Sequence, residues 1–169
     1  GDFAFLRCSN LTSIVIPDSV TSIGTAAFQN CSSLENAVIG SGVISIVDYA
    51  FSRCSSLTSI NIPDSVTEIG AFAFDGCSSL TSVTIPDSVT TIGEAAFSGC
   101  DSLTEFKGKF ASEDGRCLII DGTLNSFAPA GVTEYTIPDS VTTIGDWVFY
   151  DCSSLESVTI GDSVTEIGD

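Results

Sequence analysis

Apolar residues recur along this chain at fixed positions of a 23-residue unit. In the unit from Leu57 to Cys77, a leucine is followed by alternating isoleucines, a proline, a valine, another isoleucine, a glycine and an Ala-Phe pair. Cysteines stand at 8, 31, 54, 77 and 100, each 23 residues after the last. A fixed period of this length is typical of a solenoid, in which each unit forms one coil and stacks on the next. The pattern predicts a single array over residues 1–169.

The sequence of each unit predicts a strand, a corner, a second strand and a helical turn, in that order. The alternation of apolar and polar residues at 57–62 indicates a short β-strand. Pro63 then ends the strand, because proline has no N–H to donate. A very short second strand is expected at 66–69, followed by Gly70, where the backbone is crowded or has positive φ. The final Ala-Phe-x-x-Cys segment has the i, i+3 and i, i+4 spacing of one helical face, so one turn of helix per coil is expected.

Stacked coils place identical residues in columns about 4.8 Å apart. One column consists of phenylalanines and is expected to form the core: Phe5, Phe28, Phe51, Phe74, Phe97 and Phe149. The unit that begins at Leu34 differs from the others, because Gly40-Ser-Gly42 replaces Pro-Asp-Ser. We expect a looser turn there.

The largest departure from the pattern is the segment 104–131, which we interpret as a degenerate repeat with an inserted hairpin. Asp121-Gly122 lies between two apolar runs, 116–120 and 123–128, and this dipeptide favours a two-residue type I′ turn. The segment replaces the helical turn of one unit and contains three of the five basic residues.

Acidic side chains outnumber basic ones by 22 to 5, which gives a formal net charge of −17 at pH 7. A field of this sign repels phosphate backbones and anionic membranes, so nucleic acid is not an expected partner. Histidine, the most frequent general base and metal ligand, is absent, and no nucleophile-elbow motif occurs. No apolar run approaches the ~20 residues that span a bilayer. We therefore expect no enzyme, no cofactor and no membrane insertion in this segment.

The repeat pattern L-x-x-I-x-I-P-x-x-V-x-x-I-G-x-x-A-F-x-x-C resembles the BspA-like, Treponema-type class of bacterial leucine-rich repeat. It is almost unaltered at 57–77 and 80–100, and the resemblance covers 1–103 and 132–169. It implies a leucine-rich-repeat solenoid, a right-handed superhelix of short strands. It also implies an extracellular or cell-surface bacterial protein with a role in adhesion, whose partners include host extracellular matrix. Neither end of the chain has a polar capping unit, so we expect a fragment with neighbouring repeats or domains at both ends.

Two residue columns suggest metal chemistry, but each has a simpler interpretation. The periodic cysteines lack CxxC spacing and are expected as small core residues, with Cys117, which lies outside their column, as the thiol most different from the rest. Carboxylates recur at the corner, in Asp18, Asp64, Asp87, Asp139 and Asp162. A row of this kind could attract Ca²⁺, although bonds within each turn and a solvated edge explain it without a metal. We assign no metal ligand.

The remaining candidates for binding are side chains on the outer face of the first strands and in the inserted segment. Solenoid faces often form extended binding surfaces, and aromatic residues and arginine are enriched at interfaces. The candidates are Val15, Val38, Asn61, Thr84, Lys107, Lys109, Phe110, Arg116, Phe127 and Thr136. They support a module that binds a protein or glycan. The alternative is a structural spacer without a ligand, in which the polar face only keeps the array soluble.

Overall fold

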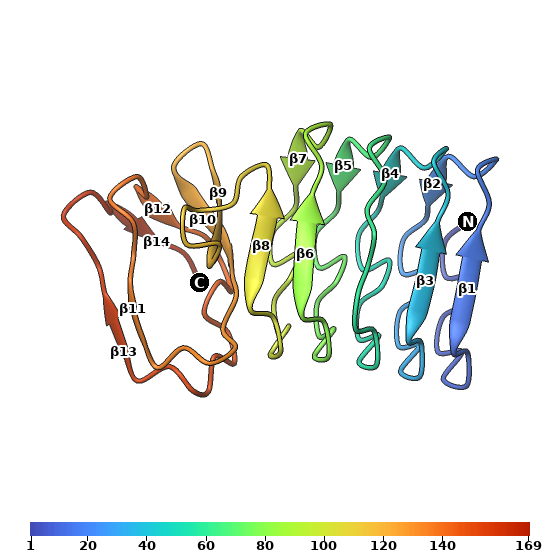
Figure 1. Ribbon diagram of the computed structural model, residues 1–169, viewed down its shortest axis with the longest axis horizontal. Coiled ribbons are helices and arrows are strands. Elements are labelled where there is room, and N and C mark those ends of the chain that lie inside the picture. Colours follow the sequence, from blue (N-terminus) through green and yellow to red (C-terminus); the bar gives the residue numbers. More distant parts are fainter.

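The computed structural model describes all residues from 1 to 169 as one stack of coils (Figure 1). Its regular elements are short β-strands: β1 Ser13–Ile16, β2 Ser22–Ile23, β3 Asn36–Ile39, β4 Ser45–Ile46, β5 Glu68–Ile69, β6 Ser82–Ile85, β7 Thr91–Ile92, β8 Glu105–Gly108, β9 Cys117–Ile120, β10 Thr123–Phe127, β11 Glu134–Thr136, β12 Thr143–Ile144, β13 Ser157–Thr159 and β14 Glu166–Ile167. The solenoid expected from the 23-residue period is confirmed.

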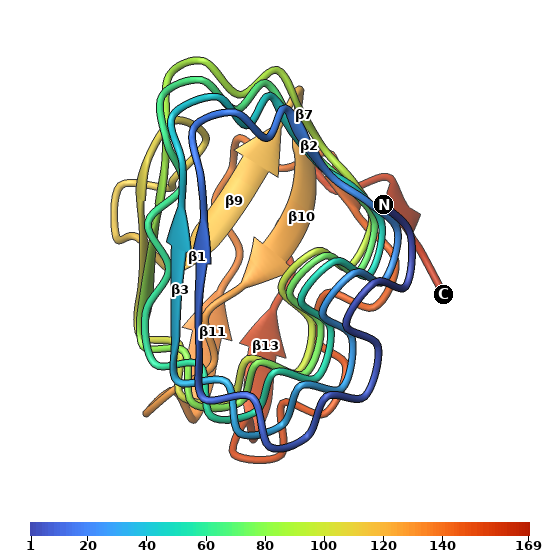
Figure 2. The same cartoon turned by 90° about the vertical axis from the view of Figure 1, so that its right-hand side faces the viewer.

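Neighbouring coils pair as parallel strands in a register of one repeat. The longer strands form three two-stranded sheets, β1–β3, β6–β8 and β11–β13. Val15 pairs with Val38 and Thr84 with Lys107, each 23 residues apart. The short strands form two four-stranded sheets, β2–β4–β5–β7 and β14–β12–β10–β9. Viewed along the stack, the coils superimpose and enclose a single interior (Figure 2).

The expected helical turn is wrong, because the structure contains no helix. The segments that follow the second strands, here called the turn modules, comprise residues 1–8, 24–31, 47–54, 70–77, 93–100 and 145–152. Within 47–54, alternate N–H groups bond within the module and to the next coil: Ala50 N donates to Val47 O, but Phe51 N donates to Ala73 O. Half of the donors that an α-helix needs therefore leave the module. The Ala-Phe-x-x-Cys spacing reflects successive turns whose side chains enter the core.

Two other local expectations also differ from the structure. Residues 57–62, predicted as a strand, form none, so the row of longer strands is interrupted between β3 and β6. The turn at 40–42, which was expected to be looser, closes with the same backbone bond as a regular corner: Val43 N donates to Gly40 O at 3.2 Å, as Val20 N does to Pro17 O at 3.0 Å. A Cβ added at Gly42 would lie 1.8 Å from Asp18 O, and Ser41 N donates to Asp18 Oδ1 at 2.7 Å. Glycine permits this close approach between coils.

Phenylalanines form a continuous stack through the first part of the core. Successive rings from Phe5 to Phe97 lie 5.0–5.5 Å apart and within 10° of parallel. Phe106, whose ring meets Phe97 edge-on at 70°, ends the stack where the repeat pattern fails. The expected phenylalanine core is confirmed for this part of the chain.

The inserted hairpin separates two hydrophobic clusters. β9 and β10 pair antiparallel, and their turn residues Asp121 and Gly122 both have positive φ (50° and 81°), as the Asp-Gly signal predicts. Adjacent residues of β9 enter different clusters. Leu118 belongs to a 33-residue N-terminal cluster, whereas Cys117 belongs to an eight-residue C-terminal cluster. The hairpin therefore crosses the interior as a wall, which Figure 2 shows from the end of the stack.

Candidate interaction surfaces

The outer positions of the longer strands lie at the surface. The candidates Val15, Val38, Asn61, Thr84, Lys107 and Thr136 are all exposed. Val15 and Val38 are neighbours in register and expose 69% and 48% of their surface. At the other end of this row, Lys107 Nζ lies 2.7 Å from Glu105 Oε1. We call this row, with the strands that carry it, the sheet face.

The candidates in the inserted segment are engaged within the fold. Lys109 occupies the proline column and caps a corner: its Nζ donates to Asp87 O at 3.2 Å and to Val89 O at 2.7 Å. The same Nζ lies 5.0 Å from the centre of the half-buried Phe110 ring. These contacts fix the point at which the chain leaves the regular coil.

The side chains of Arg116 and Phe127 also make their contacts within the fold. Arg116 Nη1 donates to Ala128 O at 3.2 Å and to Ala130 O at 2.9 Å, so its guanidinium closes the base of the hairpin. Phe127 is only 3% exposed and lies inside the C-terminal cluster. Its predicted role as a surface contact does not fit this position, because its ring cannot reach a partner. The mixture of charged and aromatic residues in the inserted segment did not show which side chains are exposed and which pack within the fold.

A hydrogen-bonded network joins the hairpin to β11. Tyr135 OH donates to Asp114 Oδ2 at 3.1 Å and lies 3.2 Å from Cys117 Sγ. Asp114 Oδ1 accepts from Ser112 Oγ and Arg116 N. Partial burial raises the pKa of Asp114, but these hydrogen bonds outweigh it and lower the pKa overall. The ionised carboxylate therefore serves as a fixed acceptor that ties the hairpin to the next strand.

The periodic cysteines are buried thiols, apart from Cys8, which is exposed, and Cys152, which is half-buried. The Sγ atoms of Cys31, Cys54, Cys77 and Cys100 each donate to the carbonyl of the phenylalanine 26 residues earlier, at 3.1–3.3 Å. Cys117, expected to be the most different thiol, is completely buried, and the exposed thiol is Cys8. Burial raises the pKa of both Cys54 and Cys117 to about 12.

We expect stability to fall as the pH rises above about 9. The unfolded thiols ionise near pKa 9.0, whereas Cys54 and Cys117 in the folded chain do so only near 12. Their stabilising contribution is therefore full below pH 9 and is lost progressively between 9 and 12, by about 1.4 kcal/mol per pH unit for each thiol. Urea midpoints at pH 8 and pH 10 measure the loss. A midpoint that is the same at both values would contradict the burial of these thiols.

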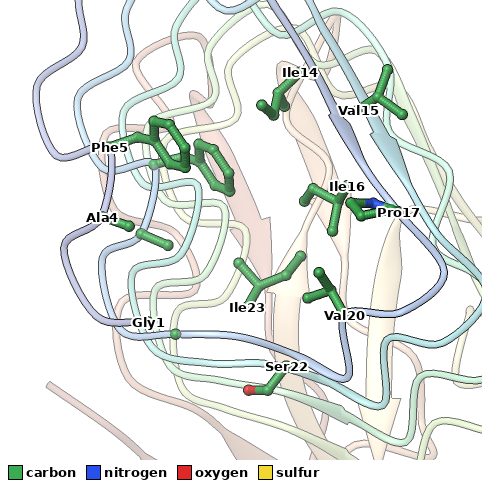
Figure 3. Close-up of a pocket in the computed structure, with 13 residues that line it drawn as sticks. Gly1, Ala4, Phe5, Ile14, Val15, Ile16, Pro17, Val20, Ser22 and Ile23 are labelled. Atoms are coloured by element: carbon green, nitrogen blue, oxygen red, sulfur yellow. The ribbon is translucent and has the colours of Figure 1, made fainter.

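The concave spaces of the structure differ in character. A hollow of about 230 Å³ lies at the N-terminal end of the stack (Figure 3). Ile16, Ile23 and Phe5 line it, and these are the residues whose counterparts fill the core of the next coils. Val15 points away from the hollow, toward the sheet face (Figure 3). The hollow is therefore an uncovered section of core, without polar groups arranged to bind a small molecule.

A polar cleft lies between the modules on either side of the hairpin, where no turn module fills the column. It has a volume of about 380 Å³ and is lined by Asp101, Asp151 and Cys152 among others. Partial burial, together with the nearby charge of Asp151, raises the pKa of Asp101. Burial and the two carboxylates raise the pKa of Cys152 to about 11. The cleft therefore disfavours anions.

The corner aspartates make fewer local bonds than expected. Asp18 accepts from Ser41 of the next coil, whereas the corners themselves close through backbone bonds such as Val66 N to Pro63 O. No group of three His, Cys, Asp or Glu side chains is arranged to hold a metal ion. The structure also contains no helix that is both long and apolar enough to cross a membrane.

A comparison with protein families decides the classification. The BspA type leucine-rich repeat region matches in six copies, over residues 1–112 and 123–169. The chain belongs to the BspA-type leucine-rich repeat family. The unmatched residues 113–122 of this BspA-type repeat array fall within the inserted segment, where β9 and the turn after it replace the regular unit.

Solved structures of bacterial leucine-rich repeat proteins share the fold of this BspA-type array. A leucine-rich cell surface protein of Faecalibacterium prausnitzii is 31% identical, with a TM-score of 0.73, and the alignment covers 99% of this chain and 53% of that one. A Bacteroides ovatus protein is 28% identical (TM-score 0.67; 100% and 66% covered), and the T. pallidum leucine-rich repeat protein 27% identical (0.66; 99% and 64%). The chain thus spans about half to two thirds of these structures. No curated protein matches the sequence.

Proposed function

We propose that this array is a non-catalytic recognition module of a cell-surface or secreted protein, and that it binds a protein or glycan through the sheet face. The observation that carries the proposal is the pair Val15 and Val38, which are exposed side by side on neighbouring strands. Burial of apolar surface contributes about 25 cal/mol per Å², so a partner that covers both valines gains affinity without any change in the fold. The cell-surface relative from Faecalibacterium prausnitzii supports the location.

The inserted segment contributes to this surface mainly through one side chain. Lys107 is exposed, pairs with Thr84 in register and extends the row toward the hairpin. Lys109 and Arg116 hold the segment in place, which leaves Lys107 and its partner Glu105 as the charged groups that a ligand meets. The proposed surface therefore runs from an apolar end at Val15 to a charged end at Lys107.

A structural spacer is the second candidate function. It is favoured by the threonine hydroxyls that form hydrogen bonds from one coil to the next. Thr104 Oγ1 donates to Thr81 O at 2.9 Å, and Thr90 Oγ1 donates to Thr67 O at 3.0 Å. These hydroxyls are satisfied between coils and need no partner. A spacer of this kind would tolerate the addition or removal of whole units.

Binding to a panel of extracellular-matrix proteins and to a glycan array separates the two functions. For a recognition module, we expect a ligand whose affinity falls at least about fivefold when Val15 and Val38 are both replaced by serine, since loss of about 1 kcal/mol is a fivefold change. Ile44→Thr is the matched control, because it removes a half-exposed apolar side chain away from the sheet face and introduces the residue common in its column. The absence of any ligand on either array would favour the spacer.

A further inference from the structure

Exposed aromatic side chains gather on a second surface, formed by the stacked turn modules. We call it the turn edge; the modules form the stepped side at the right of Figure 2. The third residue of each module is Phe3, Ala26, Tyr49, Phe72, Ala95 or Trp147. Phe3, Tyr49 and Trp147 expose 56%, 37% and 43% of their surface. Tyr49 stacks on the half-buried Phe72, with ring centres 5.1 Å apart. The rings of Trp147 and Tyr150 contact edge to face, with centres 5.4 Å apart.

The backbone conformation at this third position favours glycine, asparagine or aspartate over aromatic residues. Every one of these residues has a φ of 50–60°. Hydrogen bonds between coils enforce this conformation, since Tyr49 N donates to Ala71 O and Phe72 N to Glu94 O. For residues other than glycine, asparagine and aspartate, such a conformation costs about 1 kcal/mol or more. The seventh residue of each module also has a positive φ, and there the residue types match this cost. Four of the six seventh residues are glycine, asparagine or aspartate: Asn30, Gly76, Gly99 and Asp151. The third position instead holds aromatics in four of six.

Each exposed aromatic residue at this position follows an aspartate whose carboxylate is held in place. Asp2 precedes Phe3, Asp48 precedes Tyr49 and Asp146 precedes Trp147. In each case Oδ1 accepts a backbone N–H from the next coil, at 2.8–2.9 Å, and Oδ2 makes no hydrogen bond within the chain. Where alanine occupies the third position, the preceding residue is threonine or glutamate. The turn edge thus repeats one arrangement: an exposed aromatic residue directly after an aspartate with an oriented carboxylate.

This arrangement complements an arginine side chain. The planar guanidinium of arginine stacks on aromatic faces and forms paired hydrogen bonds to carboxylates. The ammonium of lysine is less suited to both interactions. The net charge of −17 attracts basic partners from a distance. Asp48 is exposed and forms no salt bridge within the chain, where the one ion pair joins Lys107 to Glu105. Its carboxylate therefore remains available to a partner.

We propose that the turn edge is a docking surface for an arginine-rich segment of a partner protein, with Tyr49 and Asp48 at its centre. This surface is distinct from the sheet face and does not depend on the function proposed above. The arrangements at Phe3 and Trp147 repeat the central one, so a flexible basic segment engages several at once and gains affinity from their number.

Titration with a nona-arginine peptide at low ionic strength tests the proposal. We expect Tyr49→Ala to weaken binding about two- to fivefold, as for loss of an exposed cation–π contact. The double variant Tyr49→Ala with Asp48→Asn is expected to bind less tightly than Tyr49→Ala alone. Nona-lysine is expected to bind the parent chain less tightly than nona-arginine. Quenching of Trp147, the single tryptophan, reports engagement of the C-terminal arrangement. Tyr49→Ala should fold, because alanine occupies this position in two other modules at the same φ.

Matched variants distinguish a built surface from general charge attraction. Asp64→Asn removes the same charge at an exposed corner, and Ile44→Thr removes apolar surface elsewhere; both are expected to leave binding unchanged. If Tyr49→Ala binds like the parent, or Asp64→Asn weakens binding as much as Asp48→Asn, the proposal is overturned. A glycan or a second copy of the chain whose binding is lost in Tyr49→Ala would also overturn it. Val15→Ser with Val38→Ser should retain nona-arginine binding, which separates this surface from the sheet face.

Discussion

Replacement of Phe74 by alanine is expected to destabilise the array by about 3–5 kcal/mol. The ring is fully buried and stacks on both neighbours, with centres 5.5 Å from Phe51 and 5.2 Å from Phe97. Its removal leaves a cavity in the middle of a continuous column, and the backbone ladders on either side prevent collapse of that cavity. The change in free energy of unfolding follows from urea denaturation monitored by circular dichroism.

Phe5→Ala provides the comparison at the end of the same column. Phe5 is 40% exposed and has only one ring neighbour in the column, Phe28, so its loss removes less contact and leaves no enclosed cavity. We expect a clearly smaller effect than for Phe74→Ala. Phe74→Leu, which keeps most of the volume, should cost less than the alanine variant. Equal effects for Phe5→Ala and Phe74→Ala would contradict the stacked core.

Phe127→Ala is expected to cost a similar amount, about 3–5 kcal/mol, but to act mainly on one side of the hairpin. Phe127 is 3% exposed, and its ring centre lies 4.8 Å from that of Tyr135 and 5.0 Å from that of Phe149. It is the largest side chain in the eight-residue C-terminal cluster, so its removal leaves a large cavity there. Native-state hydrogen exchange measures where protection falls.

The expected pattern is a loss of protection in 123–167 that exceeds the loss in 22–92. Phe106→Ala gives the reciprocal result, because Phe106 is 2% exposed and belongs to the N-terminal cluster. Since a wall of two strands separates the clusters, each variant should act first on its own side. A uniform loss of protection over the whole chain in both variants would show that the two clusters unfold as one unit.

The repeat pattern predicted those parts of the fold that depend on periodic side chains. The phenylalanine stack, the second strands, the first strands of all units but the one that begins at Leu57, and the Asp-Gly hairpin follow from spacing and turn chemistry. The helical turn was wrong because the i, i+3 and i, i+4 spacing records which side chains enter the core. It does not record where the backbone donors go, and in the turn modules half of them bond to the next coil.

The binding surfaces were harder to predict, because side chains with the same chemistry have different roles by position. Lys107 is exposed on the sheet face, while Lys109, two residues later, caps the Asp87 and Val89 carbonyls. Phe127 is buried, while Tyr49 lies at the surface. The signal for the turn edge was present as the pairs Asp2-Phe3, Asp48-Tyr49 and Asp146-Trp147. Its meaning required the structure, which shows the carboxylates held by bonds between coils.

The wall formed by the hairpin also affects how the array can change in length during evolution. Between regular coils, every unit offers the same columns to its neighbours, so the gain or loss of one 23-residue unit reproduces the contacts that were there before. The coils beside the hairpin are different, because Asn125 Nδ2 donates to Gly93 O and Lys109 caps the preceding corner. Duplication or deletion of a single unit there breaks bonds that no other unit can replace. Length variants should therefore arise within the regular stretches and leave the hairpin and its two flanking coils together as a fixed block.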